Sequence, residues 1–187
     1  MVELSQLWLP ILLSGAAVFF LSFLMWMVSP HHRKDWDPVP DEDGIMDHIR
    51  SQGLGGGQYT FPFCAEPSQW KDPAMIEKYN RGPKGFLILF PDGPQSMGKK
   101  MGISFVFNLI TALLVAYVAT MGVEAGADAR FVFRFVWVVA FLANSFGLVW
   151  GSIWFSRTWG STMREMFDGL VYSAATGAIF AWMWPAL

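Results

Sequence analysis

The chain has 187 residues, of which 53% are hydrophobic and 17% are aromatic, and its mean hydropathy is +0.36. This composition excludes an ordinary soluble domain and is typical of a membrane protein. The formal net charge of −2 carries little information, but the lack of a long basic segment argues against nucleic acid as a partner. Cys64 is the one cysteine, so an internal disulfide framework is excluded as well.

The first apolar segment, Leu7 to Val28, predicts a transmembrane helix. Its length suffices to cross a hydrocarbon core of roughly 30 Å. Pro10 stands in the first turn, where its missing N–H would have no partner in any case. A cleaved signal peptide would have basic residues before its apolar part and a small-residue cleavage site after it. Glu3 precedes this segment and no such site follows, so we expect residues 1–28 to be a retained anchor.

Residues 29–100 predict a small α+β insert between the first two transmembrane helices. Of the 28 charged side chains in the chain, 19 lie between Arg33 and Lys100. About 70 residues with few apolar runs make a small core, so we expect the insert to rest on the membrane surface or on a partner. The expected elements are a short helix opening at Asp41 to Asp43, a strand at Tyr59 to Phe63, a helix from Asp72 to about Asn80–Gly82, and a strand at Gly85 to Phe90.

Residues 101–187 predict transmembrane helices 2, 3 and 4. The second span, Met101 to Met121, follows Lys99 and Lys100, and the short loop Gly122 to Arg130 favours an antiparallel neighbour. Small or polar residues recur every four positions along the span, which lets neighbouring helices approach closely. These residues are Ser104, Asn108, Ala112, Ala116 and Thr120.

The segment from Phe131 to Trp184 predicts a transmembrane hairpin whose two apolar runs are separated by the polar segment Ser156 to Met166. Each run carries a small-residue stripe that predicts helix–helix contact. The stripes are Ala143, Gly147 and Gly151 on the first run, and Gly169, Ser173, Gly177 and Ala181 on the second. Replacing Gly147 and Gly151 by leucine is therefore expected to disrupt assembly. The expected fold is mainly α and polytopic, with four transmembrane helices.

The basic residues that flank the spans predict the orientation. Most of them lie on one side of the expected bundle, and basic residues favour the cytoplasmic side. We therefore expect both termini outside and residues 29–100 in the cytoplasm. The residues on the cytoplasmic side are Arg33, Lys34, Lys99, Lys100, Arg157 and Arg164, and those on the other side are Arg130 and Arg134.

His31, His32 and Asp35 are the densest group of metal-ligand types, followed by Asp37 and the acidic residues 41–43. Their spacing matches no established ligand motif, so we expect interfacial polar residues and no bound metal. All three histidines lie outside the spans, so the chain offers no intramembrane imidazole to a haem or chlorophyll. We expect no cofactor of its own, while pigments or lipids at boundaries with other subunits stay open.

Two amide side chains and two charged side chains lie inside the expected spans. Asn108 and Asn144 are near mid-membrane, where they would bond across helices or line a polar path, and we favour the structural role. Arg134 and Asp168 lie about one turn inside opposite ends. We expect Asp168 to pair with Arg164, one turn earlier on the same helix, and Arg134 to snorkel or to pair with acidic residues in the adjoining loop.

The remaining motifs predict no catalysis. Gly53 and Gly55 to Gly57 have neither the preceding strand nor the Lys-Ser/Thr pair of a phosphate-binding loop, so we expect a flexible linker. Cys64 has no histidine close by in sequence to activate it, and we expect it to be buried in the insert.

Most of the chain resembles a group of small bacterial integral membrane proteins with four helices and no assigned activity. The resemblance implies a fold and a bacterial membrane, and it carries over no catalytic residue. The residues that carry it are Leu9-Pro10-Ile11-Leu12, Pro30-His31-His32-Arg33, Pro40-Asp41-Glu42-Asp43, Ser152-Ile153-Trp154, Asp168-Gly169-Leu170 and Trp184-Pro185.

We therefore expect a non-catalytic accessory or structural subunit that contacts lipids and other integral membrane subunits. The alternative is a small channel or transporter in which Thr111 and Ser145, with the two mid-membrane asparagines, line a polar route. A third reading, a membrane enzyme that uses His31, His32 and Asp35, has the least support in the sequence.

Overall fold

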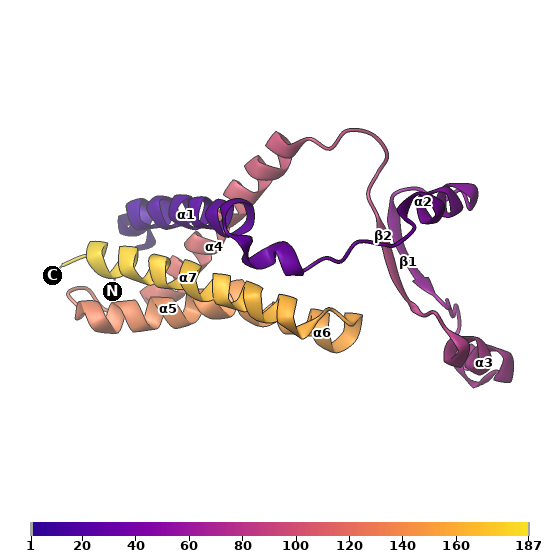
Figure 1. Cartoon of the computed structure of the whole chain (residues 1–187). Coiled ribbons are helices and arrows are strands. Elements are labelled where there is room, and N and C mark those ends of the chain that lie inside the picture. Colours follow the sequence, from indigo (N-terminus) through magenta and orange to yellow (C-terminus); the bar gives the residue numbers. More distant parts are fainter. Residues whose placement is uncertain (1, 187) are drawn as a thin grey trace. The chain divides into compact units, whose positions relative to one another are not determined.

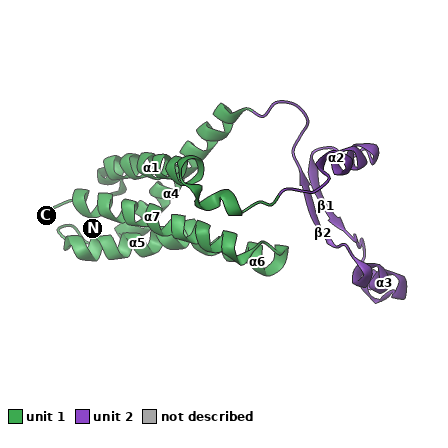
Figure 2. Cartoon of the chain, viewed as in Figure 1, with its two compact units in different colours: residues 1–37, 96–187 green, residues 38–95 purple. Residues whose placement is uncertain are grey.

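The computed structural model describes residues 2–186 and divides the chain into two compact units (Figure 2). The helical unit comprises residues 1–37 and 96–187, and the small unit comprises residues 38–95. Each is described by itself below. Residues 29–37, which we assigned to the insert, belong to the helical unit.

The helical unit is built from four long helical segments. Figure 1 shows α1, α5 and α7 lying side by side, and α4 packs on both α1 and α5. Its elements are η1 (Leu4–Leu7), α1 (Trp8–Phe23), the π-helical turn η2 (Leu24–Val28), η3 (Pro30–Lys34), α4 (Met97–Gly122), α5 (Ala129–Ser145), η5 (Phe146–Leu148), α6 (Val149–Phe155) and α7 (Trp159–Met183).

Within residues 2–186, three helical segments are long and apolar enough to cross a membrane: Leu4–Val28, Met97–Gly122 and Ala129–Phe155. With 71% of residues in helix and one two-stranded sheet, the fold is mainly helical, and these segments indicate a membrane protein. Most of their large apolar side chains are exposed, Phe107 by 65% and Met121 by 66%. An apolar surface of this extent requires lipid or partner helices around it.

The fourth expected span, α7, is not among these three segments. The helix begins at Trp159, so it takes up most of the segment that we expected to be a polar connection, and it carries Arg164, Glu165 and Asp168 in its first half. These charges lower its hydropathy below that of the other spans. Even so, α7 packs along α5 and α1, as expected for the second arm of the Phe131–Trp184 hairpin.

The core lies where α4, α5, α7 and the amino-terminal segment meet. Val115, Ala119, Val136 and Phe180 are at most 2% exposed, and Leu7 joins them from η1. Val2 and Val123 belong to the same cluster, and Gly126 N–H donates to the Pro185 carbonyl at 2.9 Å. Both ends of the described chain therefore lie at the end of the bundle that holds the α4–α5 loop.

The three small-residue stripes have different surroundings. Gly169, Ser173 and Gly177 are buried, and a Cβ at Gly177 would lie 3.1 Å from the carbonyl oxygen of Phe133 on α5. On α4, Ala112 and Ala116 are buried, Asn108 is half-buried and Ser104 is exposed. On the α5–α6 segment, Ala143 and Gly147 are exposed and Gly151 is half-buried. A Cβ at Gly147 would meet no atom of the described chain within 4 Å, so contact there requires another molecule.

Helices α6 and α7 are joined by a tight connection at Ser156, whose φ of 54° is left-handed. A buried hydrogen bond of 2.7 Å between the Ser152 and Thr162 hydroxyls closes it. Arg157 donates to Glu165 at 2.7 Å and to Ser161 at 3.0 Å. The hydrogen bond to Glu165 raises the pKa of the Arg157 guanidinium.

Changing Thr162 to valine is expected to lower the free energy of unfolding by about 1–3 kcal/mol, because the buried Ser152 hydroxyl loses its partner. The double variant Ser152→Ala/Thr162→Val is expected to recover most of this loss, because it leaves neither hydroxyl unpaired. Equilibrium unfolding in mild detergent measures both. A double variant as unstable as the single one would contradict the assignment.

The small unit contains α2 (Glu42–Ser51), β1 (Gly57–Phe61), η4 (Pro67–Lys71), α3 (Pro73–Arg81) and β2 (Gly85–Leu89). The two strands pair antiparallel with Gly57 opposite Leu89 and Phe61 opposite Gly85. Asp41 and Asp72 cap the two helices. The predicted elements are thus present, with β1 two residues earlier than expected. Cys64, which we expected to be buried in the insert, is half-buried.

Candidate functional site

A hydrogen-bonded cluster of histidine and aspartate joins the segment that leaves α1 to the first half of α7. Asp168 lies within hydrogen-bond distance of both histidines: its Oδ1 is 2.8 Å from His31 Nε2, and its Oδ2 is 2.8 Å from His32 Nε2. The side chain of Asp168 is 2% exposed, that of His32 5% and that of His31 24%. The Asp168 carboxylate on α7 thus contacts two adjacent histidines that lie more than 130 residues earlier in the chain.

Local structure explains why both histidines point the same way. Ser29 caps η3 and Pro30 occupies its first turn, which is a strong start for a short helix. The tight turn brings the two imidazole rings to a centroid distance of 4.1 Å. Trp26 stacks on His32 with the ring planes 7° apart at 3.9 Å, which fixes that ring from the side of the membrane span.

The second nitrogen of each imidazole is held as well. His31 Nδ1 lies 2.6 Å from the Ser29 hydroxyl, and His32 Nδ1 lies 2.6 Å from Asp35 Oδ2. The other oxygen of Asp35 accepts from Arg164 Nε at 2.6 Å. Arg164 also donates to the carbonyl of Lys34 at 3.3 Å, so the guanidinium ties α7 to the end of η3 a second time.

Hydrogen bonds and charges within the cluster shift the pKa values of His32 and Asp35, which both lie outside the membrane spans. Burial by itself lowers the pKa of His32, but hydrogen bonds to Asp35 and Asp168 outweigh it and raise that pKa above its usual value. Burial by itself raises the pKa of Asp35, and hydrogen bonds from His32 and Arg164 outweigh it and lower that pKa. The positive charge of Arg164 balances the negative charge of Asp35. The buried Asp168 carboxylate therefore requires a second positive charge.

The residues predicted from the sequence are only partly brought together here. His31 and His32 converge on one point, while Asp35 lies behind His32, against its Nδ1. Asp37 is exposed, and the acidic residues 41–43 belong to the small unit. The expected pairing of Asp168 with Arg164 is wrong, because Arg164 bonds Asp35 and Asp168 bonds the histidines.

Asp168 is the residue of this cluster that we did not assign to it. The signal was available: an ionisable residue inside an apolar run requires a partner or a water-filled cavity. His31, His32 and Asp168 were all expected on the cytoplasmic side of the bundle, so the histidines were available partners. Arg134, by contrast, is exposed and makes no ion pair with Glu124 or Asp128 in the described structure.

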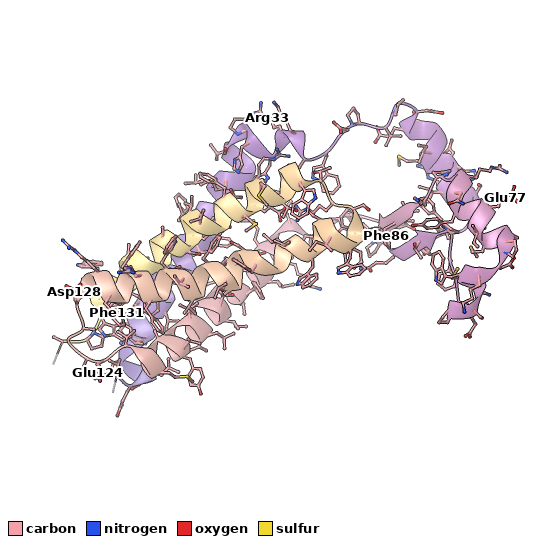
Figure 3. All side chains as sticks on the ribbon, turned by 90° about the horizontal axis from the view of Figure 1, so that it is seen from below. Arg33, Glu77, Phe86, Glu124, Asp128 and Phe131 are labelled. Carbon is pink, nitrogen blue, oxygen red and sulfur yellow. The ribbon has the colours of Figure 1, made fainter. Side chains whose placement is uncertain are left out.

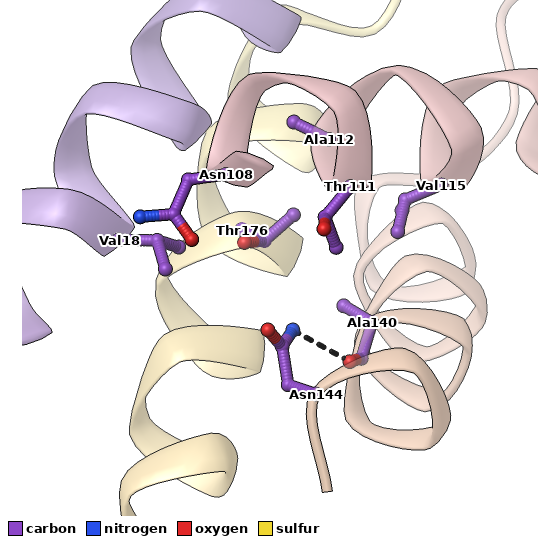
Figure 4. Close-up of a pocket in the computed structure, with 8 residues that line it drawn as sticks. All are labelled: Val18, Asn108, Thr111, Ala112, Val115, Ala140, Asn144 and Thr176. Carbon is purple, nitrogen blue, oxygen red and sulfur yellow. Dashed lines mark hydrogen bonds between the residues drawn. The ribbon is translucent and has the colours of Figure 1, made fainter. Parts of the chain in front are cut away.

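A small pocket, lined mostly by apolar surface, lies between α1, α4, α5 and α7. Figure 4 shows Asn108 and Asn144 pointing into it from different helices. Asn144 donates to the Ala140 carbonyl of its own helix at 2.8 Å. The pocket volume is about 10 Å³, close to the minimum that holds one water molecule. The remaining lining residues are Val18, Thr111, Ala112, Val115, Ala140 and Thr176.

Comparisons with known proteins found no matching family model, no matching curated protein and no matching solved structure. The class is therefore defined by the fold and the cluster: a mainly helical membrane protein with a His-His-Asp group, in which His32 and Asp168 are buried, at one end of its bundle.

Proposed function

We propose that this chain is a non-catalytic accessory or structural subunit that docks onto a larger bacterial membrane protein complex. The observation that carries the proposal is the lack of a core in the small unit. Among its residues 38–95, Pro62 alone is buried. A two-stranded hairpin with two short helices has little stability of its own in water. Such a unit is expected to gain its remaining burial from a partner.

The partner is a protein rather than a lipid surface. The small unit has eight acidic and five basic side chains, a formal charge of −3 with His48 neutral. The cytoplasmic leaflet is anionic and repels a net negative surface. Apolar side chains are nevertheless exposed on this unit: Ile88 by 66%, Phe63 by 68% and Trp70 by 49%. Apolar exposure with little positive charge favours a protein interface.

The helical unit is proposed to cross a bacterial inner membrane four times, with both termini outside. The position of both chain ends beside the α4–α5 loop supports an even number of crossings. Figure 3 places Glu124 and Asp128 at that end and Arg33 at the other, in agreement with a cytoplasmic side rich in basic residues. At 25 residues, α7 is about 37 Å long and can span the bilayer.

A small channel or transporter stays the alternative. Its polar route would pass Asn108 and Asn144, and the pocket between them is about 10 Å³. A dehydrated ion or solute would need this space to widen greatly, so the pocket gives the alternative little support. Flux through proteoliposomes that contain only this chain would favour the alternative over the subunit proposal.

The docking proposal predicts that Ile88→Lys separates the chain from its complex. Ile88 lies opposite Gln58 on an exposed sheet face, so a lysine there is tolerated by the fold but disrupts an apolar interface. Asn80→Lys adds the same charge at an exposed polar position and serves as the control. Native gels of membranes extracted in mild detergents measure the result.

We expect the wild type and Asn80→Lys to migrate in a larger assembly, and Ile88→Lys to migrate with a smaller one. Mass spectrometry of the wild-type band then identifies the other subunits. Migration of the wild type solely as an isolated monomer in several mild detergents would contradict the proposal.

A further inference from the structure

We infer that His31, His32 and Asp168 form a binding site for a divalent transition metal of the zinc class, which links the end of the first span to α7. One nitrogen from each imidazole and one carboxylate oxygen lie within 4.8 Å of one another. Nothing in the sequence spacing indicates this set, because one ligand is more than 130 residues from the other two. The inference does not depend on the proposed function.

The ring nitrogens of His31 and His32 that face away from Asp168 are each held by an oxygen, as is common for histidines that bind a metal. A histidine that binds a metal usually offers its other ring nitrogen to a carboxylate or another oxygen, which fixes the tautomer and the ring orientation. Asp35 does this for His32 at 2.6 Å, and the Ser29 hydroxyl does it for His31 at 2.6 Å. Arg164 in turn holds Asp35. Both Nε2 atoms are thereby directed at Asp168.

His32 lies between two carboxylates, with Asp35 Oδ2 2.6 Å from its Nδ1 and Asp168 Oδ2 2.8 Å from its Nε2. A neutral imidazole carries one N–H, so its other nitrogen faces a carboxylate oxygen with a lone pair. Two acceptors at this distance repel each other unless a proton or a metal ion lies between them. A divalent ion would satisfy both imidazoles and the buried carboxylate together.

The ligand types select the kind of ion. Imidazole nitrogen with carboxylate oxygen suits Zn²⁺ and neighbouring transition metals, whereas Ca²⁺ and Mg²⁺ prefer oxygen alone. At about 2.0–2.1 Å from each ligand atom, the ion would separate the nitrogen and oxygen atoms by a few tenths of an ångström more than the present 2.8 Å. The exposed edge of His31 leaves room for water as a further ligand.

A tyrosine hydroxyl lies beside the carboxylate ligand. Tyr172 stands one helical turn beyond Asp168, and residues four apart share one face of a helix. Its hydroxyl is buried next to the Asp168 carboxylate, so it lies at the edge of the proposed site.

The test uses the full chain in mild detergent, purified with an affinity tag that contains no histidine and stripped with a chelator. Zn²⁺ is titrated against bound Co²⁺, whose visible absorption reports nitrogen and oxygen ligands, and the thermal midpoint is measured with and without Zn²⁺. The variants are His31→Gln, His32→Gln and Asp168→Asn. The control is His48→Gln, since His48 is exposed and lies in the small unit.

We expect one Zn²⁺ per wild-type or His48→Gln chain, and a higher thermal midpoint when it is bound. Each ligand variant is expected to bind at least about tenfold more weakly. His31→Gln is the decisive variant, because the His31 side chain is partly exposed and its replacement disturbs the fold least. The thermal midpoint of this variant without metal reports whether the protein folds. Wild-type protein that binds no more Zn²⁺ than a folded His31→Gln variant would overturn the inference and leave the cluster as a hydrogen-bonded link.

Discussion

Replacing Gly177 by leucine is expected to lower the thermal midpoint of the protein in detergent strongly, whereas the same replacement at Gly147 leaves it unchanged. Gly177 is buried where α7 crosses α5, and a Cβ there would lie 3.1 Å from both the Phe133 carbonyl oxygen and its ring. The backbone oxygen moves only if the helices separate. Overpacking of this kind costs about 1–3 kcal/mol, and more when backbone must shift.

Gly147 is the matched control because it belongs to a small-residue stripe of the same hairpin but faces open space. Thermal unfolding of the two purified variants measures the comparison. An equal loss at both positions would show that the α5–α6 stripe packs within the chain, contrary to the structure.

The Gly147→Leu variant also bears on assembly. If the stripe of Ala143, Gly147 and Gly151 contacts another subunit, this variant keeps its thermal midpoint when isolated and is lost from the larger complex. A lowered thermal midpoint together with loss of the complex would instead indicate that the variant folds poorly.

Replacing Asp168 by asparagine is expected to be the most destabilising single change outside the core. The side chain is 2% exposed and each of its oxygens lies 2.8 Å from an imidazole nitrogen, and Asn removes its negative charge from these contacts. Removing one partner of a buried ion pair typically costs about 3–5 kcal/mol. Because the cluster links η3 to α7, we expect the loss to affect the whole helical unit.

Equilibrium unfolding in mild detergent with a chelator present measures the effect of the hydrogen bonds alone, without any metal. Glu124→Gln is the control, since it removes a carboxylate from an exposed loop of the same unit and is expected to change the unfolding free energy by less than about 0.5 kcal/mol. An Asp168→Asn variant as stable as this control would show that the cluster contributes nothing to folding.

The sequence by itself determined the class of the protein and the local elements. Apolar runs of sufficient length placed three spans close to Leu4–Val28, Met97–Gly122 and Ala129–Phe155, because crossing a bilayer requires length and hydropathy, which are local properties. The caps at Asp41 and Asp72 were equally local, since a capping side chain bonds an N–H two or three residues away.

Only the tertiary structure decided which polar groups meet and which stripes are buried. Asp168 and Arg164 lie one turn apart, and helical spacing favoured their pairing, but contacts with a segment more than 130 residues away divided them between the histidines and Asp35. Likewise, Gly147 and Gly177 occupy equivalent places in the sequence pattern. Which of them faces a helix depends on how α5 and α7 are rotated about their axes, and this rotation is set by packing across the whole bundle.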